Sequence, residues 1–344
     1  MPNHGLRFGF VLLAVTASSV VLVTVMRTKG ELPRGVDLAG GTILVYEIDP
    51  GKISGSESDP EQRIISEDLI EPLTRRINPS GTQEIVLRPY GESQIEIIVP
   101  AVDENEVNRI KKKIEEAGIL RFAILANQSD HQRQIELAQA QSESNRKGER
   151  TSPVVEDVDG SIIGRWAIVD RELPKNVGDI APLRVNVSDA ILRNPATGEI
   201  IDLPPSLRGE NAEFKIAAWV DAENMKGIET LMIVDPLLDI KGEDLAFAAS
   251  TFDQNGSPAV AFNLTDAGSG KFFALTTNNA PIGTRQRQLG IVLDDKLLSA
   301  PNILQPIRKE VRITGRFTRE EVEDLVSILK AGQLPAALTK QPIA

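Results

Sequence analysis

The chain has 344 residues, of which 41% are hydrophobic and 25% charged, and this composition and length predict about two folded domains. A net charge of -11 and an aromatic content of 4% argue against nucleic acid as a partner, because phosphates require basic surfaces and unpaired bases stack on aromatic rings. The absence of cysteine excludes disulfide bonds, thiolate metal sites and a cysteine nucleophile.

Histidine offers little for catalysis, because the sequence contains only His4 and His131. His131 lies in a polar stretch, and we interpret it as a solvated helix residue rather than as the base of a catalytic triad. Carboxylate pairs can act as general acid and base, but no pair stands out among 49 acidic residues. The residues therefore predict a protein that is not an enzyme and that uses no cofactor and no metal.

Residues 8–26 form an uncharged, mostly apolar run with Arg7 before it and Arg27 after it. A helix of about 20 such residues crosses a bilayer core, so the run predicts one transmembrane helix. A cleaved signal peptide is the alternative, but its apolar core is about 7–15 residues long and ends at small residues, unlike Arg27-Thr-Lys-Gly30. Basic residues are not concentrated before the run, so charge does not fix its orientation.

Strands and helices alternate through residues 42–125. Asp59 followed by Pro60 predicts the start of a helix that continues to about residue 77, with Gln62 at its third position. Asp103 is expected to cap a second helix. The β-branched and alternating stretches predict strands at 42–48, 84–88, 94–99 and 119–125.

Residues 126–241 are interpreted as an insertion that opens with a polar helix at 129–149. Three apolar stretches predict strands at 162–169, 183–187 and 214–220. Each tryptophan of the insertion fits the core of a small domain. The alternative is an apolar cleft for extended peptide, and its peptide-binding candidates are Trp166, Phe214 and Trp219.

Residues 242–338 return to alternating strands and helices. Asp294 and Asp295 are interpreted as a hairpin turn rather than a catalytic pair. Thr318 and Glu321 form a capping box for a helix that ends at Gly332. Two similar α+β halves are suggested by four pairs of residues at one constant offset: Ile114 and Ile328, Ala117 and Ala331, Gly118 and Gly332, Leu120 and Leu334.

The chain contains five short motifs: Gly-x-Asp-Leu-x-Gly-Gly at 35–41, Asp-Gln-Asn-Gly at 253–256, Gly-Ile-Val-Leu-Asp at 290–294, Ser-Ala-Pro at 299–301 and Ala-Gly-x-Leu-Pro at 331–335. In their order and spacing the chain resembles the SecD family. Ala39 departs from the basic residue that is usual in the family. We expect structural roles for the motif residues, with Asp37 organising a turn rather than carrying a proton. The motif residues are Gly35, Asp37, Leu38, Gly40, Gly41, Asp294, Ser299, Pro301, Gly332 and Pro335.

The resemblance implies the first membrane span and the large extracytoplasmic domain of SecD. The expected fold class is α+β, with a ferredoxin-like base built from two α+β halves that carries a smaller α+β head subdomain. The expected segments are a transmembrane helix at 8–26, the base at 31–125 and 242–338, the head at 126–241 and a tail at 339–344. SecD proteins continue into further membrane helices, to which the proton-coupling carboxylates are attributed, so we expect no proton-driven work from this chain alone.

The resemblance also implies a role as an accessory component of Sec-dependent protein export. The extracytoplasmic domain would bind unfolded preprotein, and the partners would be the Sec channel and a SecF-like or full SecDF membrane subunit. The location would be the inner membrane, with a single span and the bulk of the chain in the periplasm. The alternative is a membrane-anchored envelope protein that reuses the fold for structure or interaction, because fold does not fix function.

Overall fold

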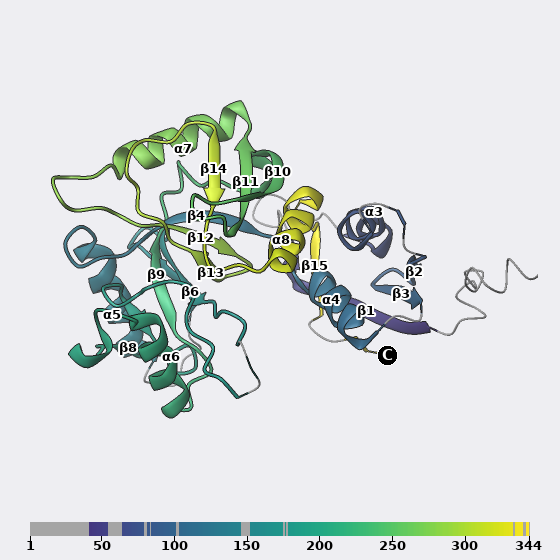
Figure 1. Cartoon of the computed structure of the whole chain (residues 1–344), viewed down its shortest axis with the longest axis horizontal. Coiled ribbons are helices and arrows are strands. Elements are labelled where there is room, and N and C mark those ends of the chain that lie inside the picture. The colour runs from purple at the N-terminus through teal and green to yellow at the C-terminus, as the bar shows by residue number, and fades with distance from the viewer. Residues whose placement is uncertain are drawn as a thin grey trace, which may run out of the picture.

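The computed structural model describes residues 41–343 except 54–63, 79–80, 83, 101–102, 146–151, 175, 177, 333 and 340–341. The described chain forms two units side by side (Figure 1). The predicted transmembrane run and the motif residues Gly35, Asp37, Leu38 and Gly40 lie outside the described residues. In the described part of the chain, no helix has both the length and the hydropathy to cross a bilayer.

The smaller unit, which we call the base unit, comprises residues 41–115 and 334–338. Its elements are β1 (Gly41–Ile53), α3 (Ser66–Ile77), β2 (Val86–Tyr90), β3 (Gln94–Pro100), α4 (Glu104–Glu115) and β15 (Ala336–Leu338). The strands form one antiparallel sheet in the order β15-β1-β3-β2. This βαββαβ sequence of elements is that of a ferredoxin-like fold, with its last strand supplied from the far end of the chain.

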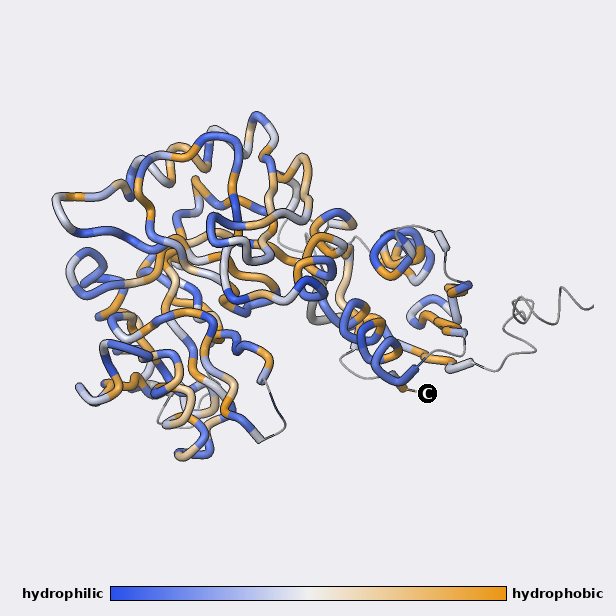
Figure 2. Tube along the Cα trace, in the orientation of Figure 1, coloured by the Kyte–Doolittle hydropathy of each residue, from blue (hydrophilic) through white to orange (hydrophobic). Residues whose placement is uncertain are grey.

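The helices of the base unit follow from local capping and amphipathic spacing. The Asp103 carboxylate accepts the Glu106 N–H at 2.9 Å and caps α4, which buries Ile110 and Ile114 on one face. Figure 2 shows hydrophobic and hydrophilic stretches alternating along α4. The helix α3 begins at Ser66 and contains Pro72, whereas the expected start at Asp59, Pro60 and Gln62 lies outside the described residues.

The larger unit, which we call the large unit, comprises residues 120–331. Its helices are α5 (Gln132–Asn145), α6 (Ala212–Ala222), α7 (Asp266–Asn278) and α8 (Arg319–Ala331), with the 3-10 turns η1 (Pro205–Leu207) and η2 (Gly242–Asp244). Its strands are β4 (Leu120–Leu125), β5 (Val154–Glu156), β6 (Ile162–Val169), β7 (Leu192–Arg193), β8 (Ile200–Ile201), β9 (Glu229–Ile233), β10 (Leu245–Phe252), β11 (Pro258–Leu264), β12 (Leu289–Leu293), β13 (Lys296–Ser299) and β14 (Glu310–Ile313).

Two sheets build the large unit, and one of them closes on itself. The order β5-β6-β13-β12-β4-β9-β7-β8 has an additional pairing between β6 and β9, so β6, β13, β12, β4 and β9 form a ring. A Cβ atom at Gly290 of β12 would lie 2.2 Å from Met232 Cε and 2.9 Å from Leu125 Cδ1. A larger residue there would displace the ends of the Met232 and Leu125 side chains, so glycine allows the close packing of neighbouring strands.

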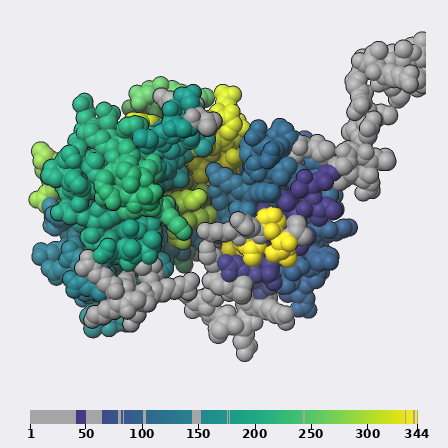
Figure 3. Space-filling view, turned by 90° about the horizontal axis from the view of Figure 1, so that it is seen from below, coloured from purple at the N-terminus to yellow at the C-terminus, as the bar shows by residue number. Residues whose placement is uncertain are grey.

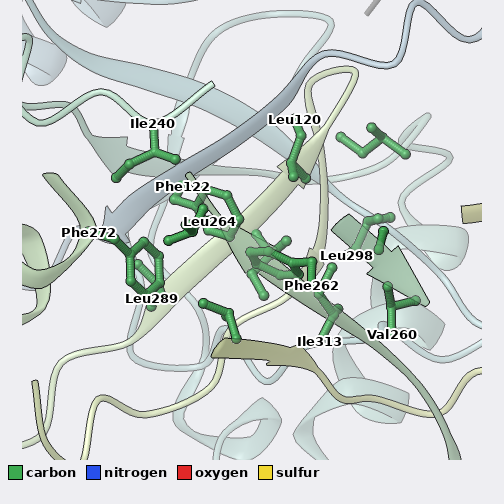
Figure 4. Close-up of a cluster of buried hydrophobic side chains, with 14 of the residues drawn as sticks. Leu120, Phe122, Ile240, Val260, Phe262, Leu264, Phe272, Leu289, Leu298 and Ile313 are labelled. Carbon is green, nitrogen blue, oxygen red and sulfur yellow. The ribbon is translucent and has the colours of Figure 1, made fainter. Parts of the chain in front are cut away.

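The second sheet, β10-β11-β14, packs against the ring through an apolar core shared with α7 and α8. Phe122 of β4 meets Phe262 of β11 and Phe272 of α7, with ring centroids 5.4 Å apart in both pairs (Figure 4). Fully burying a side chain of this size stabilises a fold by about 1.5–3 kcal/mol. This core fixes the second sheet against the ring.

The chain crosses between the two units twice, after α4 and after α8. Leu120–Leu125, which we expected to complete the first half of the base, pairs instead with β12 and β9 in the ring. Residues 242–338 were expected to form the second half of the base. The described strand that they contribute to the base sheet is β15. The two halves therefore do not form two equivalent parts of the base, although the segment boundaries themselves stay predictions. Beyond β15, the Thr339 and Ile343 N–H groups bond to β1, and Figure 3 shows the C-terminal residues against that strand.

Two further expectations about the insertion are wrong. Residues 214–220 lie in the helix α6, because Ala212, Ile216 and Val220 bury one helical face. Such a short apolar run fits a buried strand or a buried helix equally well. Residues 183–187 form no named strand, and Leu183 makes an isolated bridge to Arg171.

Candidate functional site

An open cleft of about 520 Å³ lies in the large unit, at the end of β4 and the beginning of β12. Its lining includes the turn at 126–130, the loop at 186–190 and the loop at 282–288. Ile282 lines the cleft, and 62% of its surface is exposed. The volume of the cleft lies in the range of small-molecule binding sites.

The turn that lines one side of the cleft is fixed by its own polar groups. The Asn127 side-chain oxygen accepts the Ser129 and Asp130 N–H groups at 3.0 Å each. The Asn127 N–H donates to His131 Nδ1 at 3.2 Å, and His131 is buried rather than solvated, contrary to our interpretation of the sequence. Burial lowers the pKa of His131, because the charged imidazolium is disfavoured away from water.

An ion pair joins this turn to the loop at 282–288. The Arg287 Nε donates to Asp130 Oδ2 at 3.0 Å, and the Arg285 guanidinium lies 3.7 Å from the same carboxylate. The hydrogen bond from Arg287 holds the pKa of Asp130 below its usual value. The carboxylate therefore stays charged at neutral pH and holds the two sides of the cleft together.

The lining of the cleft is mainly polar, which differs from the apolar cleft that we considered from the sequence. Its aliphatic members are Leu125, Ala126, Ala190 and Ile282. Its other members carry amides, hydroxyls or charges: Asn127, Ser129, Asp130, Asn186, Ser188, Asp189, Arg285, Gln286, Arg287, Gln288 and Asn302. Such a lining suits hydrogen bonds to a polypeptide backbone or to polar side chains.

The three aromatic peptide-binding candidates do not line this cleft and do not form one surface. Trp166 of β6 is 4% exposed, and the Arg193 guanidinium covers it at 4.3 Å from the ring centroid. Phe214 and Trp219 both belong to α6, where Phe214 is 49% exposed and Trp219 is half-buried against the core. Of the three, Phe214 is the one that a partner reaches most easily.

Asp294 ties its hairpin to the first crossing between the units. Asp294 and Asp295 have φ of 50° and 64° between the paired residues Leu293 and Lys296, which is the predicted two-residue turn. The Asp294 carboxylate accepts the N–H groups of Gly118 and Ile119 at 3.1 and 2.9 Å. Burial raises the pKa of Asp294.

The other described motif residues also have structural surroundings. The Ser299 hydroxyl donates to Thr314 O at 2.6 Å, and Pro301 O accepts the Leu289 N–H at 2.9 Å. Gly332 ends α8 with φ of 77°. Gly41 begins β1, and Pro335 immediately precedes β15. The structural role that we expect for these residues stays a prediction.

Sequence reasoning missed Arg76, which is 0% exposed and lies between the two crossings. Arg76 shares a face of α3 with the buried Leu69 and Leu73, so the helical spacing directs it toward the core and Arg75 toward solvent. Sequence reasoning overlooked this position because arginine is almost never fully buried. The Asp130–Arg287 pair was missed because its partners are 157 residues apart and no local pattern connects them. Among the described residues, no group of three or more histidine, aspartate and glutamate side chains is placed to hold a metal.

Comparison with known proteins identifies residues 220–336 as a match to the family model described as the SecDF P1 head subdomain. The protein translocase subunit SecD of Rickettsia bellii (strain RML369-C) is 27% identical over 286 residues, which are 83% of this chain and 45% of that protein. The SecD subunit of Aquifex aeolicus (strain VF5) is 25% identical over 348 residues, 96% of this chain and 62% of that protein. The SecD subunit of Koribacter versatilis (strain Ellin345) is 36% identical over 117 residues, which are 34% of this chain and 21% of that protein.

These matches confirm the resemblance to the SecD/SecDF family. The match to the P1 head model begins within the segment 126–241 and covers most of 242–338. The chain spans about half the length of the first relatives. A crystal structure of SecDF in a super-membrane-facing form superposes with a TM-score of 0.49 at 21% identity, over 95% of this chain and 34% of that one.

Proposed function

We propose that this chain is an accessory component of Sec-dependent protein export and that its described units bind unfolded polypeptide outside the cytoplasmic membrane. The observation that carries the proposal is the sequence match to SecD subunits, which extends over most of the chain. The cleft in the large unit supports it, because polar groups at its surface suit the backbone of an unfolded segment.

The proposed role is binding rather than catalysis. A bound segment outside the membrane cannot slide back through a channel, so weak and sequence-tolerant contacts would favour forward movement. The proposed partners are the Sec channel and a SecF-like or full SecDF membrane subunit, which would supply energy coupling. The proposed location is the inner membrane, with residues 8–26 as a single span and the described units in the periplasm.

Co-purification tests this function. The full chain would be captured by a C-terminal tag from membranes solubilised in mild detergent, in cells that accumulate a secretory precursor. The matched control is a tagged chain that keeps residues 1–40 and carries an unrelated folded domain in place of the rest. We expect Sec-channel subunits and the precursor with the full chain, and no precursor with the control.

Capture of unrelated envelope proteins without any Sec subunit or precursor would contradict the proposal. It would favour the role of a membrane-anchored structural or interaction protein. Equal capture of precursor by the control would show that the described units are not the part that binds it.

A further inference from the structure

The strand β10 lies at the edge of the sheet β10-β11-β14 and is the longest edge strand in the described part of the chain. It runs over Leu245–Phe252 and contains no proline and no charged residue. An edge strand exposes backbone N–H and C=O groups to any extended chain, and proteins usually shorten or charge such edges. The edge of β10 lacks both kinds of protection.

The other described sheet edges carry that protection. The edges β15, β5 and β8 are three, three and two residues long. The strand β14 has four residues with Glu310 and Arg312 exposed, and β2 contains Arg88 and Pro89. The contrast within one molecule indicates that β10 is left open to a partner.

The hydrogen-bonding groups of this edge can be assigned from the register. The Asp253 N–H bonds to Ser257 O at 2.8 Å at the end of the β10–β11 hairpin. Bonded and non-bonded pairs alternate along an antiparallel ladder, so Ala249 and Thr251 bond to β11. The N–H and C=O groups of Ala248, Ser250 and Phe252 therefore point away from β11, and within the described residues no backbone partner accepts or supplies these bonds.

The side chains along the edge define the chemistry of its partner. Phe247 and Phe252 are 58% and 55% exposed and lie on opposite faces, because their positions differ by an odd number. Side chains directly opposite each other in a ladder lie about 5 Å apart. An added strand would thus place side chains beside an aromatic ring on each face. Lys330 Nζ lies 6.0 Å from the Phe247 ring, which disfavours a basic side chain there.

We infer that the outer edge of β10 binds an extended, apolar segment of unfolded polypeptide by adding it to the sheet as a further strand. This inference rests on the proposed function and names a binding surface for it. Backbone bonds to Ala248, Ser250 and Phe252 give affinity without regard to sequence, while Phe247 and Phe252 select apolar segments. The polar cleft is a separate surface whose lining does not include these residues.

The variant Ser250→Pro tests the edge, because proline removes an outward N–H and leaves the bonds between β10 and β11 in place. Ser250→Ala is the matched control, since it changes the same side chain and keeps the N–H. The probe is fluorescein-labelled ribonuclease A, reduced and carboxymethylated so that it stays unfolded, and its native form is the negative control. The full chain would be used in detergent, and binding followed by fluorescence anisotropy.

We expect the unfolded probe to bind the wild-type chain, Ser250→Ala to bind within about twofold of it, and Ser250→Pro to bind about tenfold more weakly, a change of roughly 1.4 kcal/mol. Hydrogen exchange provides a second measurement that needs no variant. Bound probe should slow exchange at the amides of Ala248, Ser250 and Phe252, while Ala249 and Thr251 stay protected with or without it.

The outcomes separate this inference from the proposed function. Absence of probe binding by the wild-type chain would overturn both. Equal binding by Ser250→Pro, with no slowed exchange along β10, would overturn the edge and leave the proposed function standing. A wild-type dimer in sedimentation that Ser250→Pro abolishes, without probe binding at β10, would show that the edge pairs with a second copy and would also overturn the inference.

Discussion

Arg76 and Gly332 are 256 residues apart in the sequence and meet between the two units, where Arg76 Nη2 donates to Gly332 O at 2.7 Å. The same guanidinium donates to the carbonyl oxygens of Glu116 and Ala117. One side chain at the end of α3 therefore holds both crossings of the chain, after α4 and after α8. A Cβ atom at Gly118 would lie 2.5 Å from Arg76 Nη2, so glycine there makes room for the contact.

The substitution Arg76→Met is expected to reduce the free energy of unfolding by about 2–4 kcal/mol, because it leaves buried carbonyl groups without donors. Burial lowers the pKa of Arg76 to about 10, which still leaves it charged at neutral pH. Urea denaturation followed by circular dichroism measures the change. The matched control is Arg75→Met on the same helix, whose side chain is 59% exposed and pairs with Glu71 at 3.7 Å. Arg75→Met should reduce the free energy of unfolding by less than about 1 kcal/mol. An equal reduction in both variants would refute the assigned role of Arg76.

The substitution Gly290→Ala is expected to destabilise the large unit by about 1–3 kcal/mol, because the added methyl group overpacks the ring of strands beside Met232 and Leu125. Thermal unfolding measures the effect. Adding Met232→Ala should recover part of the Gly290→Ala loss, so that the double variant is less destabilised than the sum of the two single variants. The control is Gly270→Ala in α7, which has open space around it and should be neutral or stabilising by up to about 1 kcal/mol.

His131 should make stability depend on pH near the cleft. Its pKa is lowered in the folded chain, so the unfolded chain binds the proton more readily. The stability that neutral His131 contributes is therefore complete above its unfolded pKa of about 6.5 and is lost as the pH falls below that value. Protonation of Nδ1 also removes the acceptor of the Asn127 N–H.

Urea denaturation at pH 7.5 and 5.5 measures this dependence. We expect His131→Gln to reduce the difference between the two pH values, and His4→Gln, which changes the other histidine of the sequence, to leave it unchanged. If His131→Gln leaves the difference in unfolding free energy between the two pH values unchanged, the pH dependence comes from the carboxylates and not from His131.

Substitutions of the aromatic candidates Trp166 and Phe214 should differ in their effect on the free energy of unfolding. Trp166→Ala is expected to cost about 3–5 kcal/mol in unfolding free energy, because it empties a buried site beneath Arg193. Phe214→Ser changes an exposed side chain and should alter unfolding free energy by no more than about 0.5 kcal/mol. Denaturation and unfolded-probe binding would be measured on both. Weaker binding by correctly folded Trp166→Ala would contradict its assignment to the core.

Local features were predictable because they depend on neighbouring residues. The turn at Asp294 and Asp295 needs two residues that tolerate positive φ between two strands, and the structure contains it. The caps at Asp103 and Thr318 each accept the N–H three residues ahead, as the sequence predicts. The SecD-like motifs gave the family resemblance for a similar reason, because each is a short pattern that can be recognised without knowing the fold.

The tertiary structure decided which strands share a sheet. Leu120–Leu125 and Ala336–Leu338 follow similar helix ends, yet one enters the ring and the other completes the base sheet. The difference depends on partners more than a hundred residues away, which periodicity within a strand cannot identify. The exposure of the β10 edge and the burial of Arg76 have the same origin. The sequence by itself determined the capped helix starts and the turn at Asp294 and Asp295 through local propensities, and the family likeness through short motifs. The helical state of residues 214–220, the burial of side chains and the position of strands at sheet edges were decided by non-local packing between segments that meet only in the folded chain.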